Sequence, residues 1–333
     1  MSPADRRRLI AIVRGFRGRR VAVLADLVCD EFVHGDIARI SREAPVLILE
    51  HTKTETIAGG GANAAANLRA LGAIPVPVGV VGRDEAGASL LRLFRRLGIA
   101  TRGIVVLPGY TTPTKSRVLA GGVHTRRQQI VRIDRGGKPG SLPRAVAARL
   151  ERALRAALAR AEGLLVADYG YGAAVPALVD ATRARWRGKV VTVDSRHRIL
   201  AYRRVTAITP NQEEVERALA LAGPPRDADL AAAGKALLAR TGDTHVLVTR
   251  GARGMVLFGK RAKPLAIPAF GSGEVADVTG AGDTVVATFT LALLAGASPD
   301  DAAFLANVTA GLAVMKYGTA TIRPAEIVAA LRS

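Results

Sequence analysis

The residues best suited to chemistry stand together near the C-terminal end of the chain, in the run ADVTGAGDTVVA. Gly280, Ala281 and Gly282 are small, so the backbone can turn tightly there and come close to a ligand. A long uncharged run follows and predicts a buried helix over residues 284–296. Because free N–H groups at a helix start carry partial positive charge, the three small residues could cradle a phosphoryl group in transfer.

Asp283 follows this cradle directly. A carboxylate at that position could take the proton from a hydroxyl that attacks the phosphoryl group. The alternative is an ordinary turn in which Asp283 caps the following helix. The local run leaves both interpretations open, so the elements around it must decide between them.

The composition describes a chain with a large core and a strong basic excess. Its 333 residues are 49% hydrophobic and only 4% aromatic, and the formal net charge is +20. The excess is mostly Arg in short, scattered runs, without a nucleic-acid-binding signature or a set of aromatics for base stacking. We therefore attribute the charge to a solvated surface and expect no nucleic-acid partner.

Cysteine content and hydropathy limit the cellular setting. Cys29 is the single cysteine, which excludes an internal disulfide and a zinc site built on cysteines. The apolar run near the N-terminus is broken at Arg14 and is too short for a signal peptide. No apolar run reaches the ~18 residues of a transmembrane helix. We expect a cytoplasmic protein without a membrane partner.

Short apolar runs alternate with amphipathic segments along most of the chain. Predicted strands cover residues 21–25, 76–81, 164–167, 190–193, 207–209 and 245–249. Predicted helices cover residues 3–17, 85–97, 142–161, 173–186, 211–221, 227–241, 284–296, 300–316 and 324–332. This alternation indicates a mainly parallel sheet with helices on both faces. The runs at 255–258 and 264–267 predict an antiparallel hairpin at its edge.

Two segments without helical periodicity predict a second, smaller sheet. They cover about 31–57 and about 104–134, and the later one holds Gly121 and Gly122 between two strand-like runs, which is a hairpin signal. Such excursions could pair into a lid that excludes competing water from a site. We therefore expect one α/β domain over residues 1–333, with this lid inserted.

Polar side chains follow several predicted strands, at the edge where parallel sheets bind ligands. Asp26 ends the first strand and Asp30 comes four residues later. Both could grip sugar hydroxyls, and loop capping is the alternative. Asp168 and Asp194 end later strands at the same edge.

A glycine-rich turn and a helix start add two further candidate groups. Gly59 and Gly60 could admit a polar substrate close to the backbone, with Asn63 hydrogen-bonded to it, and close helix packing is the alternative. Neither standard nucleotide-binding glycine pattern occurs in the chain. Asn211 and Glu214, one helical turn apart, could organise hydrated Mg²⁺ and phosphate or form a capping box.

Together these motifs resemble the ribokinase-like carbohydrate kinases of the phosphofructokinase-B type, over essentially the whole chain. The most specific parts are the GGGAN run at 59–63 with its helix to residue 73, and the DVTGAGD run at 277–283. The resemblance implies a three-layer α/β/α sandwich with a small β-sheet lid. It also implies ATP-dependent phosphorylation of a sugar, with Asp283 as the base.

The resemblance also implies roles for the other candidates. Asn211 and Glu214 match the family's N-x-x-E element, which is implied to act through Mg²⁺. The sugar would be held by Asp26, Asp30, Gly59, Gly60, Asn63 and Asp168. The nucleotide would lie near Asn211, Thr249, Gly251, Gly254, Val278 and Asn307.

Within the family, the chain looks most like the heptose-7-phosphate kinases of the lipopolysaccharide-core pathway, on the runs at 34–46, 127–134 and 168–170. The implied product is the 1,7-bisphosphate of D-glycero-β-D-manno-heptose, formed at O1 with release of ADP. Another sugar, such as fructose, ribose or a hexose phosphate, is the alternative. A phosphorylated acceptor needs a cation at its phosphate, and the candidates are Lys115, Arg117, Arg132 and Arg196.

The chain departs from the subfamily at two lysines, which bears on the choice of sugar. Arg196 and Tyr171 stand where the subfamily has lysine, and Ala25 replaces a glycine before Asp26. The subfamily often carries a fused nucleotidyltransferase. This chain ends at Ser333, after the kinase motifs, and we expect no such domain in it.

Two other classes of function remain as hypotheses. One is a non-catalytic sugar or nucleotide sensor on the same fold, which the intact Asp283 and glycine pair disfavour. The other is a nucleic-acid-binding protein, motivated only by the net charge. The exposed edges of the lid strands favour a homodimer formed through the lid.

Overall fold

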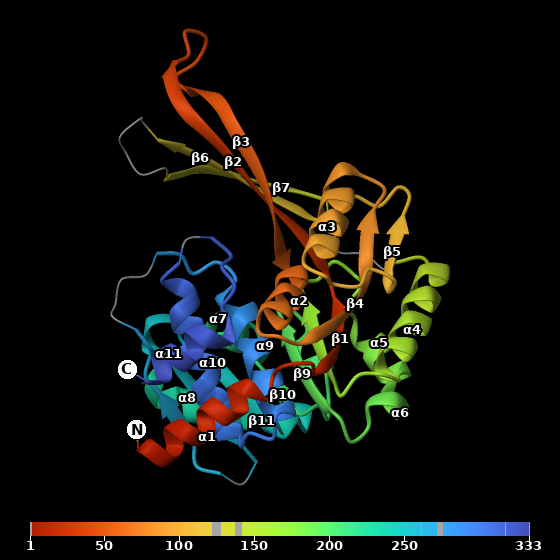
Figure 1. The fold of residues 1–333 in the computed structure, drawn as a ribbon, viewed down its shortest axis with the longest axis vertical. Coiled ribbons are helices and arrows are strands. Elements are labelled where there is room, and N and C mark those ends of the chain that lie inside the picture. The colour runs from red at the N-terminus through yellow and green to blue at the C-terminus, as the bar shows by residue number, and fades with distance from the viewer. Residues whose placement is uncertain are drawn as a thin grey trace.

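The computed structural model describes residues 2–121, 128–136, 142–260, 262–271, 276–316 and 318–332 (Figure 1). A central sheet runs through the body. Within the described residues its strands are, in spatial order, β13 (Leu265–Ile267), β12 (Met255–Gly259), β11 (His245–Thr249), β10 (Ala207–Ile208), β9 (Val190–Ser195), β8 (Gly163–Asp168), β1 (Arg20–Ala25), β4 (Ile74–Gly82) and β5 (Ile104–Leu107). All neighbours from β5 to β11 are parallel, whereas β12 and β13 are antiparallel, as the predicted edge hairpin required.

Helices cover both faces of this sheet, because alternate residues of each strand point to opposite sides. On one face lie α1 (Pro3–Arg14), α2 (Gly61–Ala70), α3 (Glu85–Arg96), α9 (Ala281–Leu294), α10 (Pro299–Val314) and α11 (Pro324–Arg332). On the other lie α4 (Arg144–Leu158), α5 (Pro176–Ala181), α6 (Arg183–Trp186), α7 (Gln212–Leu219) and α8 (Asp227–Thr241). In β1, Val21 and Val23 belong to the first core and Ala22 and Leu24 to the second. The result is the expected three-layer α/β/α sandwich.

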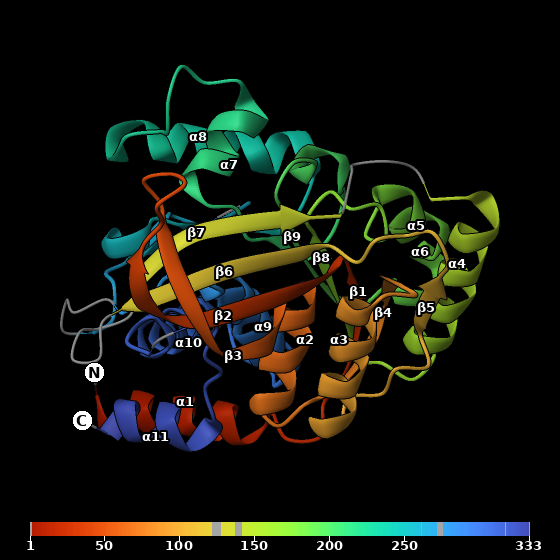
Figure 2. The ribbon, with the colours of Figure 1, turned by 90° about the horizontal axis from the view of Figure 1, so that it is seen from above.

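A second sheet forms the lid. Its strand order is β3 (Leu47–Gly60), β2 (Leu27–Ile40), β6 (Thr114–Gly121) and β7 (Gln128–Arg135). The long β2–β3 hairpin projects from the body in Figure 1, and in Figure 2 the lid strands cross over its top. β2 begins two residues after β1 ends, so the lid grows directly out of the central sheet.

The structure differs from the sequence-based expectation in the extent of the lid. Strand β5, at the start of the expected 104–134 excursion, pairs with β4 and belongs to the central sheet. The lid hairpin of β2 and β3 extends beyond the expected 31–57 at both ends. β6 and β7 pair antiparallel as predicted, and Gly122 of the predicted Gly121–Gly122 link lies outside the described residues.

The helix expected over 173–186 is broken into α5 and α6. Pro176 starts α5, and the N–H groups of Ala173 and Ala174 donate to Asp26 instead of joining a helix. Thr182 then interrupts the helix, because its hydroxyl donates to the carbonyl groups of Leu178 and Val179.

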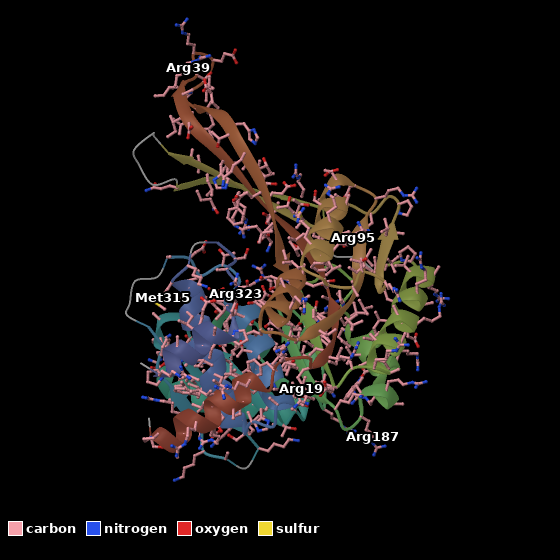
Figure 3. The ribbon with its side chains drawn as sticks, viewed as in Figure 1. Arg19, Arg39, Arg95, Arg187, Met315 and Arg323 are labelled. Carbon is pink, nitrogen blue, oxygen red and sulfur yellow. The ribbon has the colours of Figure 1, made fainter. Side chains whose placement is uncertain are left out.

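Arginines are distributed widely over the molecule. The labelled Arg39, Arg95 and Arg187 lie far apart in Figure 3, on the lid, on α3 and at the opposite end of the body. This distribution agrees with the scattered Arg runs of the sequence. Among the described residues, no helix combines the length and apolar character needed to cross a bilayer.

Candidate active site

The residues predicted to form a phosphoryl cradle lie at the N-terminus of α9. The helix begins at Ala281, so the small residues and Asp283 make its first turn instead of preceding it. Gly280 caps it with φ +79°, and a Cβ there would lie 2.4 Å from Asn63 Nδ2, so only glycine fits. Ala281 N donates to Val278 O and Thr284 N donates to Gly280 O, so among the N–H groups of this turn those of Gly282 and Asp283 are left to face a ligand.

Asp283 is buried and held by two side chains. Asn63 Nδ2 donates to its Oδ2 at 2.9 Å, and the Tyr169 hydroxyl donates to its Oδ1 at 2.8 Å. Burial raises the pKa of Asp283 to about 7, although both hydrogen bonds lower it. A carboxyl with such a pKa can accept a proton near neutral pH, which is what a general base requires.

The orientation of Asn63 follows from its neighbours. Asn67 Nδ2 donates to Asn63 Oδ1 at 3.1 Å, and the Thr284 hydroxyl donates to Asn67 Oδ1 at 3.1 Å. The Asn63 amide is therefore turned with its N–H₂ toward Asp283. Asn63 thus contacts and orients the candidate base, whereas the sequence predicted a contact with the sugar.

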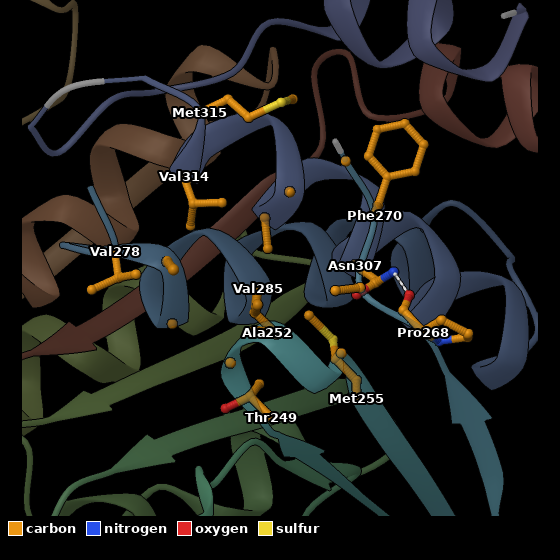
Figure 4. Close-up of a pocket in the computed structure, with 18 residues that line it drawn as sticks. Thr249, Ala252, Met255, Pro268, Phe270, Val278, Val285, Asn307, Val314 and Met315 are labelled. Atoms are coloured by element: carbon orange, nitrogen blue, oxygen red, sulfur yellow. Dashed lines mark hydrogen bonds between the residues drawn. The ribbon is translucent and has the colours of Figure 1, made fainter. Parts of the chain in front are cut away.

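A largely apolar pocket of about 480 Å³ lies on one side of the cradle (Figure 4). It is lined by five of the predicted nucleotide-binding residues, Thr249, Gly251, Gly254, Val278 and Asn307. Asn307 Nδ2 donates to Pro268 O at 2.8 Å and so holds one wall in place. Its apolar walls come from residues that sequence analysis missed, among them Met255, Phe270, Val285, Val314 and Met315.

A polar pocket of about 350 Å³ adjoins the first one. The two pockets share Thr249, Val278 and Gly282 as lining residues. A Cβ at Gly282 would meet no atom within 4 Å, so this residue faces open space. The shared wall at the start of α9 is thus the place where ligands in the two pockets would meet.

Asp194 and Glu214 both line the polar pocket. Burial raises the pKa of Asp194 well above its usual range, and the charge of Glu214 raises it further. Burial also raises the pKa of Glu214. Two carboxylates in one pocket disfavour each other's ionised form, and a hard divalent cation such as Mg²⁺ would relieve this repulsion. Asp194 is the penultimate residue of β9, a strand-end position that was expected from the sequence without an assigned role.

The predicted metal pair, Asn211 and Glu214, forms a capping box at the start of α7. Asn211 Oδ1 accepts from Glu214 N, and Glu214 Oε2 accepts from Asn211 N, both at 2.9 Å. This is the alternative weighed from the sequence. In the described part of the chain, no cluster of three or more His, Cys, Asp or Glu side chains is placed to hold a metal ion. A bound Mg²⁺ would therefore depend on phosphate and water for its other ligands.

Several predicted substrate-binding residues come together where the lid meets the body. The buried Asp30 pairs with Arg117, whose Nη1 lies 3.1 Å from its Oδ2. Gly59 is required beside this pair, because a Cβ there would lie 2.5 Å from the Asp30 carboxyl group. Gly60, with φ +48°, packs nearby against Val28.

Lys115 lies among other cations in the same region. Burial lowers the pKa of its ammonium group, and the charge of Asp30 opposes this. The charges of Arg196, Arg132 and Arg117 lower the pKa further, so all four predicted cations are within electrostatic reach of one place. Arg132, on β7, also pairs with Asp134 at 2.9 Å and is about half exposed.

Asp26 and Asp168 have the contacts of structural anchors. The carboxyl oxygens of Asp26 accept from the backbone N–H groups of Tyr169, Tyr171, Ala173 and Ala174, at 2.8–3.1 Å. Asp168 accepts from the Ser195 and Tyr202 hydroxyl groups and from Arg198 Nε. Both residues are 1% exposed. These contacts favour the loop-capping alternative for Asp26 and give Asp168 a similar role.

Tyr169 is the main site residue without a predicted role. It was visible only as the second residue of the strand-end motif after β8. Its contact with Asp283 spans 114 residues of sequence, and a local pattern carries no signal for such a contact. The apolar residues of the pocket walls could not be predicted for the same reason, because a Met or Val in the sequence cannot be told from an ordinary core residue.

Comparison with known proteins agrees with this geometry. Residues 26–326 match the family described as pfkB family carbohydrate kinase. The chain is 43% identical over 327 residues to the bifunctional protein HldE of Mesorhizobium japonicum, covering 96% of this chain and 63% of that protein. It is 40% identical over 332 residues to HldE of Caulobacter vibrioides, covering 98% and 66%. The chain thus spans just under two thirds of the length of these relatives.

Solved structures show the same fold at low sequence identity. Phosphofructokinase-2 from Escherichia coli, in complex with substrates and products, matches with a TM-score of 0.74 and 18% identity, over 95% of this chain and 100% of that one. Arabidopsis thaliana ribokinase, complexed with ribose and ATP, matches with a TM-score of 0.70 and 19% identity, over 95% and 99%. From the family match and the close relatives together, the chain is a carbohydrate kinase and belongs to the pfkB family.

Proposed function

We propose that this chain, as a single kinase domain with a lid, transfers the γ-phosphoryl group of ATP to O1 of D-glycero-β-D-manno-heptose 7-phosphate. The products would be the 1,7-bisphosphate and ADP. The observation that carries this choice is the setting of Lys115, a partly buried lysine whose pKa is lowered by the charges of Arg117, Arg132 and Arg196. Such a concentration of cations suits an acceptor that is already phosphorylated.

The two adjoining pockets suit the donor. The apolar pocket offers Met255, Val285 and Phe270 as surfaces for an aromatic base, and a pocket of this size can hold a nucleoside. The triphosphate would then extend past Gly282 into the polar pocket, along the N–H groups at the start of α9. The ribokinase structure with ribose and ATP supports this choice of donor.

The chemistry follows from the position of Asp283. As the acceptor hydroxyl attacks the γ-phosphorus, its proton passes to the Asp283 carboxylate, and the bond between the γ-phosphorus and the β,γ-bridging oxygen breaks. ADP leaves with that oxygen. The N–H groups at the helix start stabilise charge on the transferring phosphoryl group. Mg²⁺, held near Asp194 and Glu214, would neutralise charge on the β- and γ-phosphates when bound.

A coupled ADP-release assay with Mg-ATP tests the proposal. The acceptor panel is the heptose 7-phosphate, fructose 6-phosphate, fructose 1-phosphate, ribose, fructose and adenosine, and the Asp283→Asn variant is the negative control. Selective turnover of the heptose phosphate supports the proposal. Selective turnover of an unphosphorylated sugar would keep the kinase and remove the phosphate-binding role of the four cations.

We also propose a homodimer formed through the lid. Large apolar side chains are exposed on the lid strands and at their tip, namely Ile37, Ile40, Val46, Leu47, Ile130, Val131 and Ile133. Because apolar surface is typical of interfaces, we propose that a second lid covers these side chains. Light scattering on the wild type and on an Ile40→Glu, Val46→Glu double variant tests this, and a monomeric wild type would refute it.

A further inference from the structure

Tyr169 lies between the candidate base and the lid. Its hydroxyl donates to Asp283 Oδ1 at 2.8 Å, and Lys115 Nζ lies 5.7 Å from the centre of its ring. Tyr169 follows β8 of the central sheet, whereas Lys115 belongs to lid strand β6. One side chain therefore contacts both the base of the body and a cation of the lid.

The backbone around Tyr169 is fixed by the two anchor carboxylates. Tyr169 N donates to Asp26 Oδ2 and Gly170 N donates to Asp168 Oδ1, each at 3.0 Å. Gly170 has φ +87°, which lets the chain turn sharply after the tyrosine. The direction of the ring is thus set by buried groups, and a tyrosine held in this way can orient a partner.

The Tyr169 hydroxyl is a lasting hydrogen-bond donor. Burial and the charge of Asp283 raise the pKa of its phenol well above the usual 10, so it keeps its proton across the working range. With Asn63 on the other oxygen, the Asp283 carboxyl group is held from two sides. Each carboxylate oxygen has a second lone pair, which leaves room for the acceptor's proton.

We propose that Tyr169 is a positioning residue for phosphoryl transfer. Its hydroxyl orients the Asp283 carboxylate, and its ring positions the Lys115 ammonium group through a cation–π contact. One side chain thus aligns the lid with the base. The inference rests on the proposed function, in which Asp283 is the base.

The Tyr169→Phe variant removes the hydroxyl and keeps the ring. Because the hydrogen bond favours ionised Asp283, its loss should raise the pKa of that carboxyl. We expect the acid limb of the kcat profile to move up by about one pH unit and kcat at pH 7 to fall about fivefold, because less Asp283 is ionised there. Superimposable profiles for the variant and the wild type would overturn the proposal.

Tyr202→Phe is the matched control. It also removes a buried tyrosine hydroxyl bonded to a carboxylate, but its partner is Asp168. It should lose thermal stability and keep the acid limb where the wild type has it. If Tyr202→Phe moved the acid limb of the kcat profile as far as Tyr169→Phe does, the shift would reflect a general disturbance of the loop, and the proposal would fail.

Tyr169→Leu separates the two parts of the role, because it removes the ring as well. With Lys115 no longer seated, KM for the phosphorylated acceptor should rise several-fold above that of Tyr169→Phe, and KM for ATP should stay the same for both. Equal acceptor KM values for the two variants would remove the lid from the proposal.

A readout without turnover keeps this inference separate from the proposed function. In protein labelled with ¹³C-aspartate, the carboxyl resonance of Asp283 is identified by its loss in Asp283→Asn and titrated in the wild type and in Tyr169→Phe. A midpoint about one unit higher in the variant supports the proposal even if no acceptor is turned over. Equal midpoints would refute it even if the kinase is active.

Discussion

Two sets of buried carboxylates lie within one region of this molecule and are used differently. Asp26 and Asp168 are surrounded by donors from the backbone, from hydroxyl groups and from Arg198. Asp283 has two side-chain donors and a pKa raised to about 7 by burial. The first pair holds a loop in place, and Asp283 is left able to exchange a proton. Burial and position at a strand or helix end therefore do not separate the candidate base from the structural carboxylates, whereas the donors around each carboxylate do.

Among the substitutions that distinguish the two sets of carboxylates, we expect Asp283→Asn to have the largest effect on turnover. The amide cannot take a proton, so kcat should fall about 10²–10⁴-fold. ATP should bind as it does to the wild type, because Asp283 does not line the apolar pocket. Turnover assays and calorimetric titration with ATP measure the two effects. Near-normal turnover would contradict the assignment of the base.

The same variant should change how stability depends on pH. The pKa of Asp283 is about 7 in the folded chain, against about 3.9 when unfolded. The folded state therefore holds a proton that the unfolded state has released, and this contribution to stability is lost as pH rises from about 4 to about 7. Urea unfolding should show that the unfolding free energy of Asp283→Asn, relative to that of the wild type, increases from pH 4 to pH 7 by on the order of 4 kcal/mol. A difference that stays flat with pH would contradict the raised pKa.

Asp26→Asn should act on the fold more than on the chemistry. Its amide N–H₂ would face backbone N–H groups that now donate to a carboxylate oxygen, so about 3 kcal/mol of unfolding free energy should be lost. The drop in kcat per folded molecule should be far smaller than for Asp283→Asn. Asp229→Asn, at an exposed ion pair with Arg226, is the control and should cost less than about 1 kcal/mol. Equal losses of unfolding free energy in Asp26→Asn and Asp229→Asn would refute the role of Asp26 as a structural anchor.

Alanine substitutions at two glycines of the cradle should have the smallest effects, one on stability and the other on ATP use. Gly280→Ala forces a side chain onto φ +79° and against Asn63, and should cost about 1–3 kcal/mol. Gly282→Ala meets no atom within 4 Å, so the fold should tolerate it. Its methyl group would enter the space where the two pockets meet, and we expect kcat/KM for ATP to fall about tenfold. Thermal melts and steady-state kinetics separate the two variants, and the reverse pattern would refute the assignment.

The sequence predicted most of this fold because the signals were local. Strand and helix alternation predicts the parallel sheet, and the GAGD run predicts the start of α9, where we propose the base and the cradle. Where the structure differed, partners distant in sequence decided the outcome. The sequence assigned β5 to the lid, but β5 pairs with β4 and so belongs to the central sheet. The helix expected over 173–186 is divided into α5 and α6 partly because the N–H groups before Pro176 donate to Asp26.

The candidate site was predicted in its parts and missed in its connections. Gly59, Asp30 and Arg117 were each named from the sequence, but their close packing required the register of β2 against β3 and β6. Asn63 was placed beside the sugar because no local pattern shows that its amide reaches Asp283. Asp194 and Glu214 also share a pocket only in the folded chain.

The place of β1 in the central sheet has a consequence for the growing chain on the ribosome. β1 pairs with β4 on one side and with β8 on the other, where Val21 lies opposite Gly163. Until the codons up to about Asp168 have been translated, one edge of this strand, which is buried from Val21 to Ala25, has no partner. An uncovered apolar edge is a site for aggregation, and pairings of this sequence separation form slowly. We therefore expect nascent chains stalled before β8 to bind chaperones and those stalled well beyond it to be released.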